Sequence, residues 1–163
     1  MPQRSLTVEQ ILALLAAAPT RIAALSDGLT PAQLRKPPRP GEWSINEVLA
    51  HLRSCADVWG GCIERILAEE MPTIKAMNPT TWIKHTNYPD LDFHPSFQAF
   101  AAQRATLLTI LEPLPPEAWS REANVTGAGK PLIRSVYTYA ESLVVHERPH
   151  LKQIQRLINT IRE

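Results

Sequence analysis

Cysteine is scarce in this sequence, and neither sign of charge is in excess. Its two cysteines, Cys55 and Cys62, lie seven residues apart on one predicted helix. That spacing separates them by roughly 10 Å, too far for a disulfide, and free thiols fit a reducing compartment. Seventeen basic and sixteen acidic side chains give a net charge of +1. This balance argues against the basic surface with which proteins bind nucleic acid or anionic membranes.

Long hydrophobic runs and familiar catalytic loops are also missing. The N-terminal apolar run, residues 11–18, has eight residues, whereas a helix that spans a bilayer needs about 20. It follows Glu9 and precedes Pro19, and it lacks the basic start and cleavage region of a signal peptide. No glycine-rich phosphate loop, Ser-His-Asp order, internal repeat or convincing series of strands is present. We therefore expect a soluble, cytoplasmic protein.

The chain does contain four stretches of helical periodicity. With 163 residues, 44% of them hydrophobic, residues 1–163 fit one compact domain with a sizeable core. Apolar residues recur at helical spacing over residues 7–25, 45–69 and 96–112, and from Pro131 toward the last residues, with proline-rich connections between them. A short turn is expected at residues 116–119. The patterns predict an all-α fold, a four-helix bundle with a long connection between its second and third helices.

The second of these helices has the clearest start. Ser44 and Glu47 match the S-x-x-E capping box, in which each side chain accepts a hydrogen bond from the other residue's backbone N–H. Trp43 before the cap and Val48 after it suit a hydrophobic staple. The cap therefore also fixes the place of His51 on this helix.

The long connection, residues 70–95, has no periodicity and contains four prolines. A loop of this length in a small domain is uncommon, and is usually functional or disordered. Its aromatic and histidine side chains make disorder less attractive. Two interpretations stay open: a packed flap over a functional site, or a crossover pinned to the core.

Three of the five histidines occupy places that favour a metal site. His146 and His150 project from one face of the last helix about 6 Å apart, close enough to bind one ion. Both fall within the apolar stripe of that helix, and His51 lies on the flank of the stripe of the second helix. Buried imidazoles need polar partners, which a shared metal supplies. Three histidines with open positions for water form a catalytic rather than a closed structural site.

Two other interpretations compete with this one. A core histidine is usually satisfied by a neighbouring carbonyl or carboxylate, and this holds for each of the three taken alone. Residues 146–150 also spell H-E-x-x-H, the zinc-protease signature. We discount a protease, because Pro149 removes a helical N–H and because Glu163 is the sole acid after His150.

Some nearby side chains are candidates for a role beside the metal. Cys55, one turn after His51, suits a fourth ligand or a nucleophile, although packing is the better explanation of a small thiol. Glu147 and Glu47 are candidate catalytic bases to a metal-bound water. The alternative explanation of Glu147 is a position on the solvated edge of its helix. The alternative explanation of Glu47 is its part in the helix cap.

Four further residues are weaker candidates. Tyr137 and Tyr139 suit a role in orienting substrate, although Tyr139 also fits the core. His85 and His94 reach the metal only if the long loop folds inward, and a surface position is favoured for both.

Two segments resemble those of a known family. Residues 41–52, Gly-Glu-Trp-Ser-Ile-Asn-Glu-Val-Leu-Ala-His-Leu, resemble the second-helix signature of the DinB-like superfamily, and residues 146–154 are similar to its last-helix motif, H-x-x-x-H-L-x-Q-I. The resemblance covers nearly the whole chain in order and spacing. It implies a four-helix bundle with one divalent ion, nickel, zinc or manganese, held by His51, His146 and His150. Pro149 departs from the usual pattern, which puts the distance between the last two histidines in question.

The resemblance also implies a class of chemistry. Many members of this superfamily are known only as metal-dependent hydrolases, and relatives are S-transferases and isomerases that use low-molecular-weight thiols such as bacillithiol or mycothiol. Homodimers are frequent among them. A small-molecule substrate, a small thiol and a homodimer are therefore the expected partners.

These observations predict a divalent-metal-dependent enzyme of the DinB-like type. The ion would lower the pKa of water, or of a small thiol, toward neutrality and so create a nucleophile for hydrolysis or S-transfer. The sequence does not choose between the two reactions. The alternatives are a non-catalytic bundle that binds metal or a small ligand for storage, sensing or stress response, and a purely structural protein with hydrogen-bonded histidines.

Overall fold

Four long helices form the bulk of the molecule. The computed structural model describes residues 5–163, so residues 1–4 of the predicted domain lie outside it. The helices are α1 (Val8–Ser26), α3 (Ile45–Ala68), α5 (Phe93–Leu111) and α7 (Val136–Ile161). They coincide with the four stretches of helical periodicity, although α5 begins three residues earlier and α7 five residues later than predicted.

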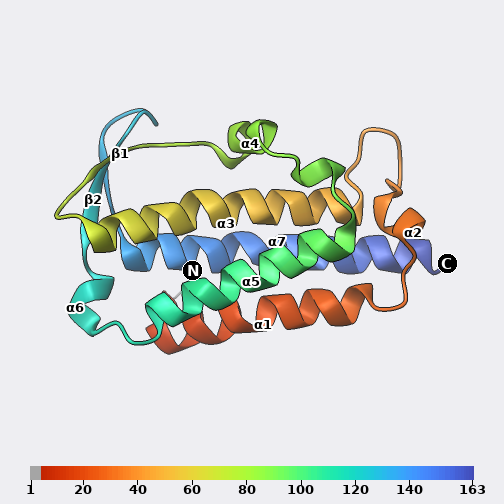
Figure 1. Cartoon of the computed structure of the whole chain (residues 1–163), viewed down its shortest axis with the longest axis horizontal. Coiled ribbons are helices and arrows are strands. Elements are labelled where there is room, and N and C mark those ends of the chain that lie inside the picture. Colours follow the sequence, from red (N-terminus) through yellow and green to blue (C-terminus); the bar gives the residue numbers. More distant parts are fainter. Residues whose placement is uncertain (1–4) are drawn as a thin grey trace.

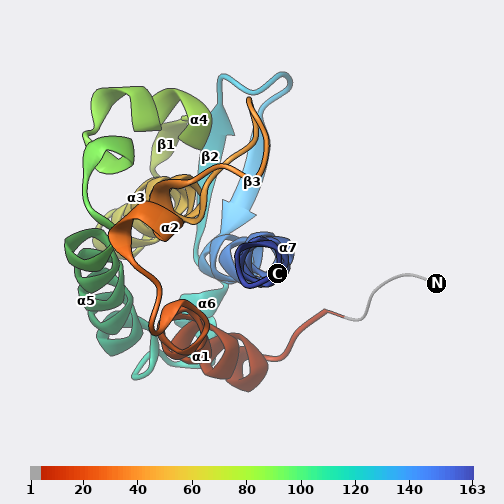
Figure 2. The same cartoon turned by 90° about the vertical axis from the view of Figure 1, so that its right-hand side faces the viewer.

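These helices form a closed ring of neighbours. Both α3 and α1 pack against α7 and against α5, and Figure 2, which looks along the bundle, shows one long helix at each corner. In Figure 1, α1 and α7 run from left to right, whereas α3 and α5 run from right to left. Because α3 and α5 are parallel, the chain between them has to travel back along the length of the bundle. This explains the long connection that the sequence predicted.

The start of α3 and the course of α7 follow from local sequence. The predicted capping box is confirmed: the side chain of Ser44 accepts from the N–H of Glu47, and that of Glu47 from the N–H of Ser44, each at 3.1 Å. α7 continues through Pro149. Pro149 and Val145 are both exposed, so water can bond to the Val145 carbonyl that loses its helical partner.

A small sheet lies at the end of the bundle where α3 stops and α7 starts (Figure 1). Its strands are β1 (Thr73–Lys75), β2 (Glu122–Thr126) and β3 (Leu132–Ser135), in the order β1-β2-β3. The first pair is parallel, with Ile74 opposite Val125, and the second is antiparallel, with Leu132 opposite Val125. The fold is thus mostly helical, as predicted, with a sheet that the sequence pattern did not reveal.

The predicted start of the last helix at Pro131 was wrong. Residues 132–135 pair with β2 instead, and the side chain of Ser135 then accepts from the N–H of Thr138 at 3.1 Å. This bond caps α7 at its observed start. A proline is as compatible with the beginning of an edge strand as with the first turn of a helix.

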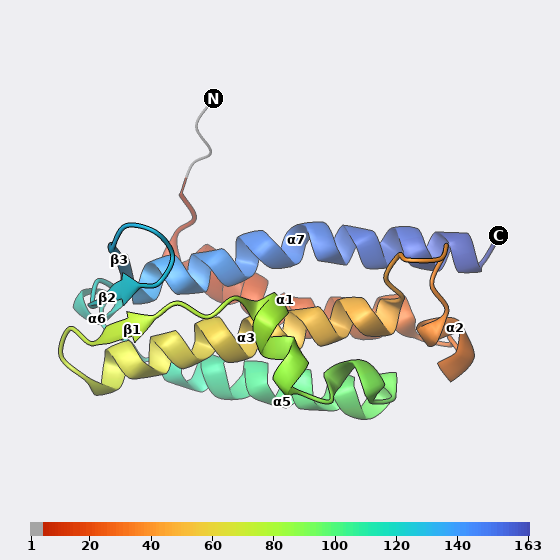
Figure 3. The same ribbon diagram turned by 90° about the horizontal axis from the view of Figure 1, so that it is seen from above.

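The connection between α3 and α5 crosses the outer side of α3 (Figure 3) and is ordered. Besides β1 it contains α4 (Pro79–Trp82) and two 3-10 turns, η1 (Ile83–His85) and η2 (Tyr88–Asp90). Asp57 of α3 accepts hydrogen bonds from the Trp82 indole at 3.0 Å and from the Tyr88 hydroxyl at 2.6 Å. It also accepts one from Gln103 of α5 at 2.6 Å. The segment is therefore a crossover pinned to α3.

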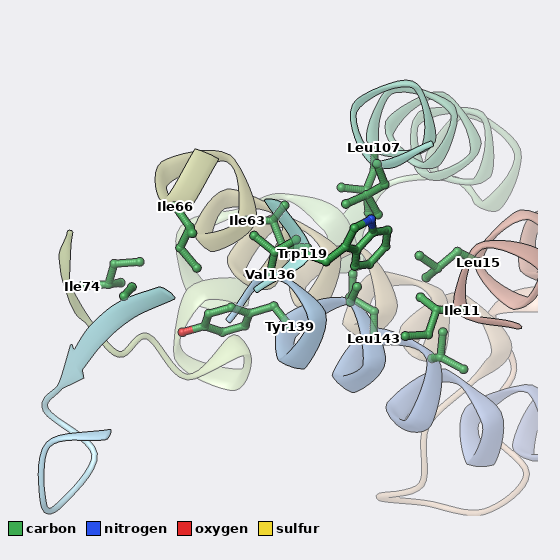
Figure 4. Packing of buried hydrophobic residues seen from close by; sticks show 14 of the residues in the cluster. Ile11, Leu15, Ile63, Ile66, Ile74, Leu107, Trp119, Val136, Tyr139 and Leu143 are labelled. Atoms are coloured by element: carbon green, nitrogen blue, oxygen red, sulfur yellow. The ribbon is translucent and has the colours of Figure 1, made fainter. Parts of the chain in front are cut away.

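The hydrophobic core has two parts. Figure 4 shows the part nearer the sheet, where Trp119 of α6 (Pro116–Trp119) packs among residues of all four long helices. The other part surrounds Phe100 and includes Leu34 of α2 (Pro31–Arg35). Among the described residues, α1 is the one helix long and apolar enough to cross a membrane, a test that the core helix of a soluble protein also passes. Its residues Ile11 and Leu15 are fully buried in this core.

Candidate metal centre

The three predicted histidines meet between α3 and α7. The ring centroids of His51 and His146 are 4.9 Å apart, those of His51 and His150 4.9 Å, and those of His146 and His150 4.6 Å. His51 comes from the capped start of α3, and the other two lie one turn apart on α7. Pro149 has therefore not separated the pair on α7.

The closest atoms of the cluster include a sulfur. Nε2 of His51 lies 3.2 Å from Nε2 of His146, and Sγ of Cys55 lies 3.6 Å and 3.9 Å from these two nitrogens. The ligand atoms of His51, Cys55 and His146 all lie within 4.8 Å of one another, and His150 is not part of this set among the described residues. Cys55 is 2% exposed, so it is buried as the packing explanation required, but its sulfur faces the histidines.

The rings are held in place from outside the cluster. Nδ1 of His150 bonds to the side-chain oxygen of Gln153 at 2.9 Å. Because that oxygen only accepts, Nδ1 is the donor, which leaves Nε2 as the candidate ligand atom of this ring. The ring of Trp43 lies 5.1 Å from that of His51, and the ring of Trp59 5.2 Å from that of His146. Nδ1 of His146 is buried and has no partner among the described residues.

The surroundings favour neutral imidazoles. Burial, and then the neighbouring His150 and His146, lowers the pKa of His51 to about 4. Burial and His150 also lower the pKa of His146. Burial, with a contribution from Glu147, raises the pKa of the Cys55 thiol to about 12. At neutral pH the two imidazoles are therefore uncharged, and their lone pairs are available to a cation.

Glu147 is buried rather than solvated. It is 4% exposed and forms an ion pair with Arg104 of α5, which is 2% exposed. Both carboxylate oxygens accept from the guanidinium, and Arg104 also donates to the Leu15 carbonyl at 3.0 Å. The solvated edge that was the alternative explanation of Glu147 is therefore wrong.

The remaining candidates lie outside the histidine cluster. Glu47 is engaged in the cap of α3, and His85 and His94 are exposed, as favoured. Tyr137 donates to the Leu6 carbonyl at 2.6 Å. Tyr139 is buried in the core.

A cleft of about 550 Å³ borders the cluster on the side of His146. Its apolar walls come from α3, α7, the start of the crossover and the antiparallel pair β2–β3, and include Trp59, Met77 and Leu132. Arg134 of β3 also lines it and forms no ion pair with any described residue. The carboxylate of Glu141 on α7 lines the cleft as well. The cleft is therefore an apolar chamber with one cation and one carboxylate in its lining, and it reaches the edge of the histidine cluster.

Comparison with known proteins identifies the family of this chain. The model of the DinB superfamily matches residues 14–154. The chain belongs to the DinB superfamily. A protein of Geobacillus thermodenitrificans named "Putative metal-dependent hydrolase" is 25% identical over 160 residues, 94% of this chain and 85% of that protein. A protein of Geobacillus kaustophilus with the same description is 23% identical over 92% of this chain and 83% of its own length.

A solved structure confirms the fold of this DinB-superfamily chain. It is that of YfiT from Bacillus subtilis, described as a probable metal-dependent hydrolase with an unusual four-helix bundle topology. The TM-score is 0.75 at 22% identity, and the match covers 96% of this chain and 90% of YfiT.

The residues present fit the divalent ion that a DinB-like site implies. Two nitrogens bound to one tetrahedral zinc ion at about 2.05 Å lie about 3.3 Å apart, and the two Nε2 atoms here lie 3.2 Å apart. The third ring, His150, bonds to Gln153 through Nδ1, so Nε2 is its candidate ligand atom. The separation of the His51 and His146 nitrogens and the neutral state of these two rings thus both suit a cation.

The sequence analysis missed several residues that shape this DinB-superfamily site. Gln153 stood in the quoted last-helix motif, three residues after His150, a spacing at which one helical side chain can support another. Trp59 follows Cys55 by one turn on the same face of α3, and this spacing could have placed it beside the site. Arg104 gave no local signal, since its partner Glu147 lies 43 residues away.

Proposed function

We propose that this protein is a divalent-metal-dependent enzyme with His51, His146 and His150 as metal ligands, acting on a small molecule by hydrolysis or S-transfer. The observation that carries the proposal is the meeting of three imidazoles from α3 and α7 at the edge of a cleft. The names of the two Geobacillus relatives support metal-dependent hydrolysis. Nickel, zinc and manganese are the candidate ions.

The metal ion would act as a Lewis acid. Bound to these imidazoles, it would lower the pKa of a coordinated water or small thiol toward neutrality. The neutral state of His51 and His146 prepares the site for the ion without a competing proton.

The cleft is the proposed substrate site. Its volume suits a small organic molecule, and its apolar walls would exclude water from the reacting group. Arg134 offers charge and hydrogen bonds to an acidic group of the substrate or of a thiol cofactor, because guanidinium pairs with carboxylates in bidentate fashion. Because Glu141 lines the same cleft, the substrate class that we propose is a small molecule with an apolar body and one acidic group placed at Arg134.

A non-catalytic bundle that binds metal or a small ligand is the second candidate function. The close approach of Cys55 favours it, since a further protein ligand leaves fewer positions open for substrate. Metal-loaded protein can be offered esters, amides and electrophiles with small thiols. Turnover that a chelator abolishes supports the enzyme, whereas tight binding without turnover supports the binding module. A homodimer and a cytoplasmic location stay predictions.

The ligand assignment has a direct test in His150→Ala. We expect this variant to lose most of its bound metal in elemental analysis while its helical circular dichroism is unchanged, since His150 lies in the cluster. His94→Ala is the matched control, because His94 is an exposed histidine on α5. Full metal content in His150→Ala would contradict the assignment.

A further inference from the structure

Of the two free cysteines, Cys55 is the one that faces the histidine cluster. Its sulfur lies within 4 Å of a ring nitrogen of both His51 and His146. Cys62, two turns further along α3, lines the cleft instead and lies against Tyr139. The same helix thus carries one thiol inside the cluster and one outside it.

The separations match those of ligands on a single ion. A nitrogen and a sulfur bound to one tetrahedral zinc ion, at about 2.05 Å and 2.3 Å, lie about 3.6 Å apart. The two sulfur–nitrogen distances here are 3.6 Å and 3.9 Å, and the nitrogen–nitrogen distance is 3.2 Å. The sulfur can donate its proton to one ring and accept from the N–H of the other, so the inference depends on the match of all three separations to those around one ion.

We propose that the Cys55 thiolate is a fourth ligand to the divalent ion, beside His51, His146 and His150. This inference rests on the metal site of the proposed function and adds a soft donor to it. Thiolate and imidazole together suit zinc and cobalt, whereas manganese prefers oxygen ligands. Cys55 therefore disfavours manganese, and a tetrahedral arrangement of thiolate and imidazole ligands favours zinc over nickel. With Cys55 bound, four protein ligands would hold the ion, and catalysis would require a substrate group to enter as a fifth ligand.

Cobalt substitution reports directly on the thiolate. We expect the wild-type protein loaded with Co²⁺ to show a thiolate-to-metal charge-transfer band in the near ultraviolet. Cys55→Ser should lose this band and keep the d–d bands of a nitrogen- and oxygen-bound ion. Cys62→Ser, which removes the other thiol of the same helix, should keep it. Zinc affinity of Cys55→Ser should fall by about 100-fold or more, because changes to ligand-supporting residues alone cost 10–100-fold, while manganese affinity should change little.

X-ray absorption on the zinc-loaded wild type needs no variant and covers the case in which Cys55→Ser fails to fold. One sulfur at about 2.3 Å supports the inference. A shell of nitrogen and oxygen alone, with metal bound, overturns the Cys55 assignment and leaves the proposed function standing. Absence of stoichiometric binding of any tested divalent ion by the wild type overturns both.

Discussion

Arg104 and Glu147 form a buried ion pair between the helices of this molecule. Arg104 on α5 also bonds to the Leu15 carbonyl of α1, so the pair joins three of the four long helices. Glu147 directly follows His146 on α7, and the pair therefore fixes the helical segment that carries two of the proposed ligands. Because both of its oxygens are engaged, Glu147 can act as a base only after one of these bonds opens. Its role as a general base stays a prediction.

Variants of Arg104 and Glu147 separate the structural role of the ion pair from a catalytic role of Glu147. Arg104→Met should lower the free energy of unfolding by about 3–5 kcal/mol, because it leaves a buried carboxylate without its partner. Arg104→Met combined with Glu147→Met should recover most of this loss in urea unfolding. If the double variant is stable and binds metal but has no turnover, Glu147 contributes to the reaction; unchanged turnover would exclude it as the base. A single Arg104→Met variant as stable as the wild type would show that the pair contributes nothing.

At the residue scale, the sequence predicted the side chains whose positions follow from helical spacing and from helix caps. His51, His146 and His150 were found because an i, i+4 pair and a capping box fix positions on a helix. Cys55 was judged a packing residue, because thiol burial is common and a sequence gives no distance from one helix to another. The partner of Glu147 was missed for the same reason.

Asp57 organises the element that crosses the outside of α3. Its carboxylate accepts three hydrogen bonds, two from the crossover and one from α5. Arg53 of α3 adds a cation–π contact, 3.7 Å above the Tyr88 ring. The crossover contributes few side chains to the hydrophobic core, so these polar contacts hold it against α3.

We expect Asp57→Asn to loosen the crossover while leaving the bundle folded. An amide has one acceptor oxygen where the carboxylate had two, so donors are left unpaired at a cost of about 1–3 kcal/mol each. Hydrogen exchange of residues 79–92 should become faster, with that of α1 unchanged. Glu64→Gln is the control, because Glu64 is an exposed acid on the same helix. Unchanged exchange in the crossover would show that Asp57 does not hold it.

Elements were predicted correctly where the apolar periodicity extends over a long segment. The four long helices carry an apolar stripe over 19 residues or more, and each was found. The strands have three to five residues, too short to show an alternating pattern. They form because β1 and β2, which lie about fifty residues apart, pair with each other, a contact that no local pattern contains.

The whole molecule is a bundle of two parallel helix pairs whose proposed metal centre bridges α3 and α7. His51 and His146, two of the side chains that meet there, are uncharged at neutral pH, so the stability of the metal-free protein depends on their protonation. The pKa of His51 is lowered from 6.5 to about 4 in the folded state. Between these pH values the unfolded chain therefore binds a proton that the folded chain does not.

It follows that metal-free protein should lose stability as the pH falls from 6.5 toward about 4. The contribution of neutral His51 to the free energy of unfolding is fully present above pH 6.5. It is lost as the pH falls toward the pKa of His51 in the folded state, at up to about 1.4 kcal/mol per pH unit for each proton. Urea unfolding after chelation measures this slope. His51→Gln should have a shallower slope over the same range; equal slopes would contradict the lowered pKa.

The distance along the chain between the proposed ligands has a consequence for biosynthesis. His51 precedes His146 by 95 residues, and α3 and α7 pack directly against each other. While a ribosome is still translating the crossover and α5, the face of α3 that packs against α7 has no partner helix, and its imidazole and thiol are open to metal ions and oxidants. The nascent chain therefore passes through a vulnerable interval that ends when α7 emerges and docks.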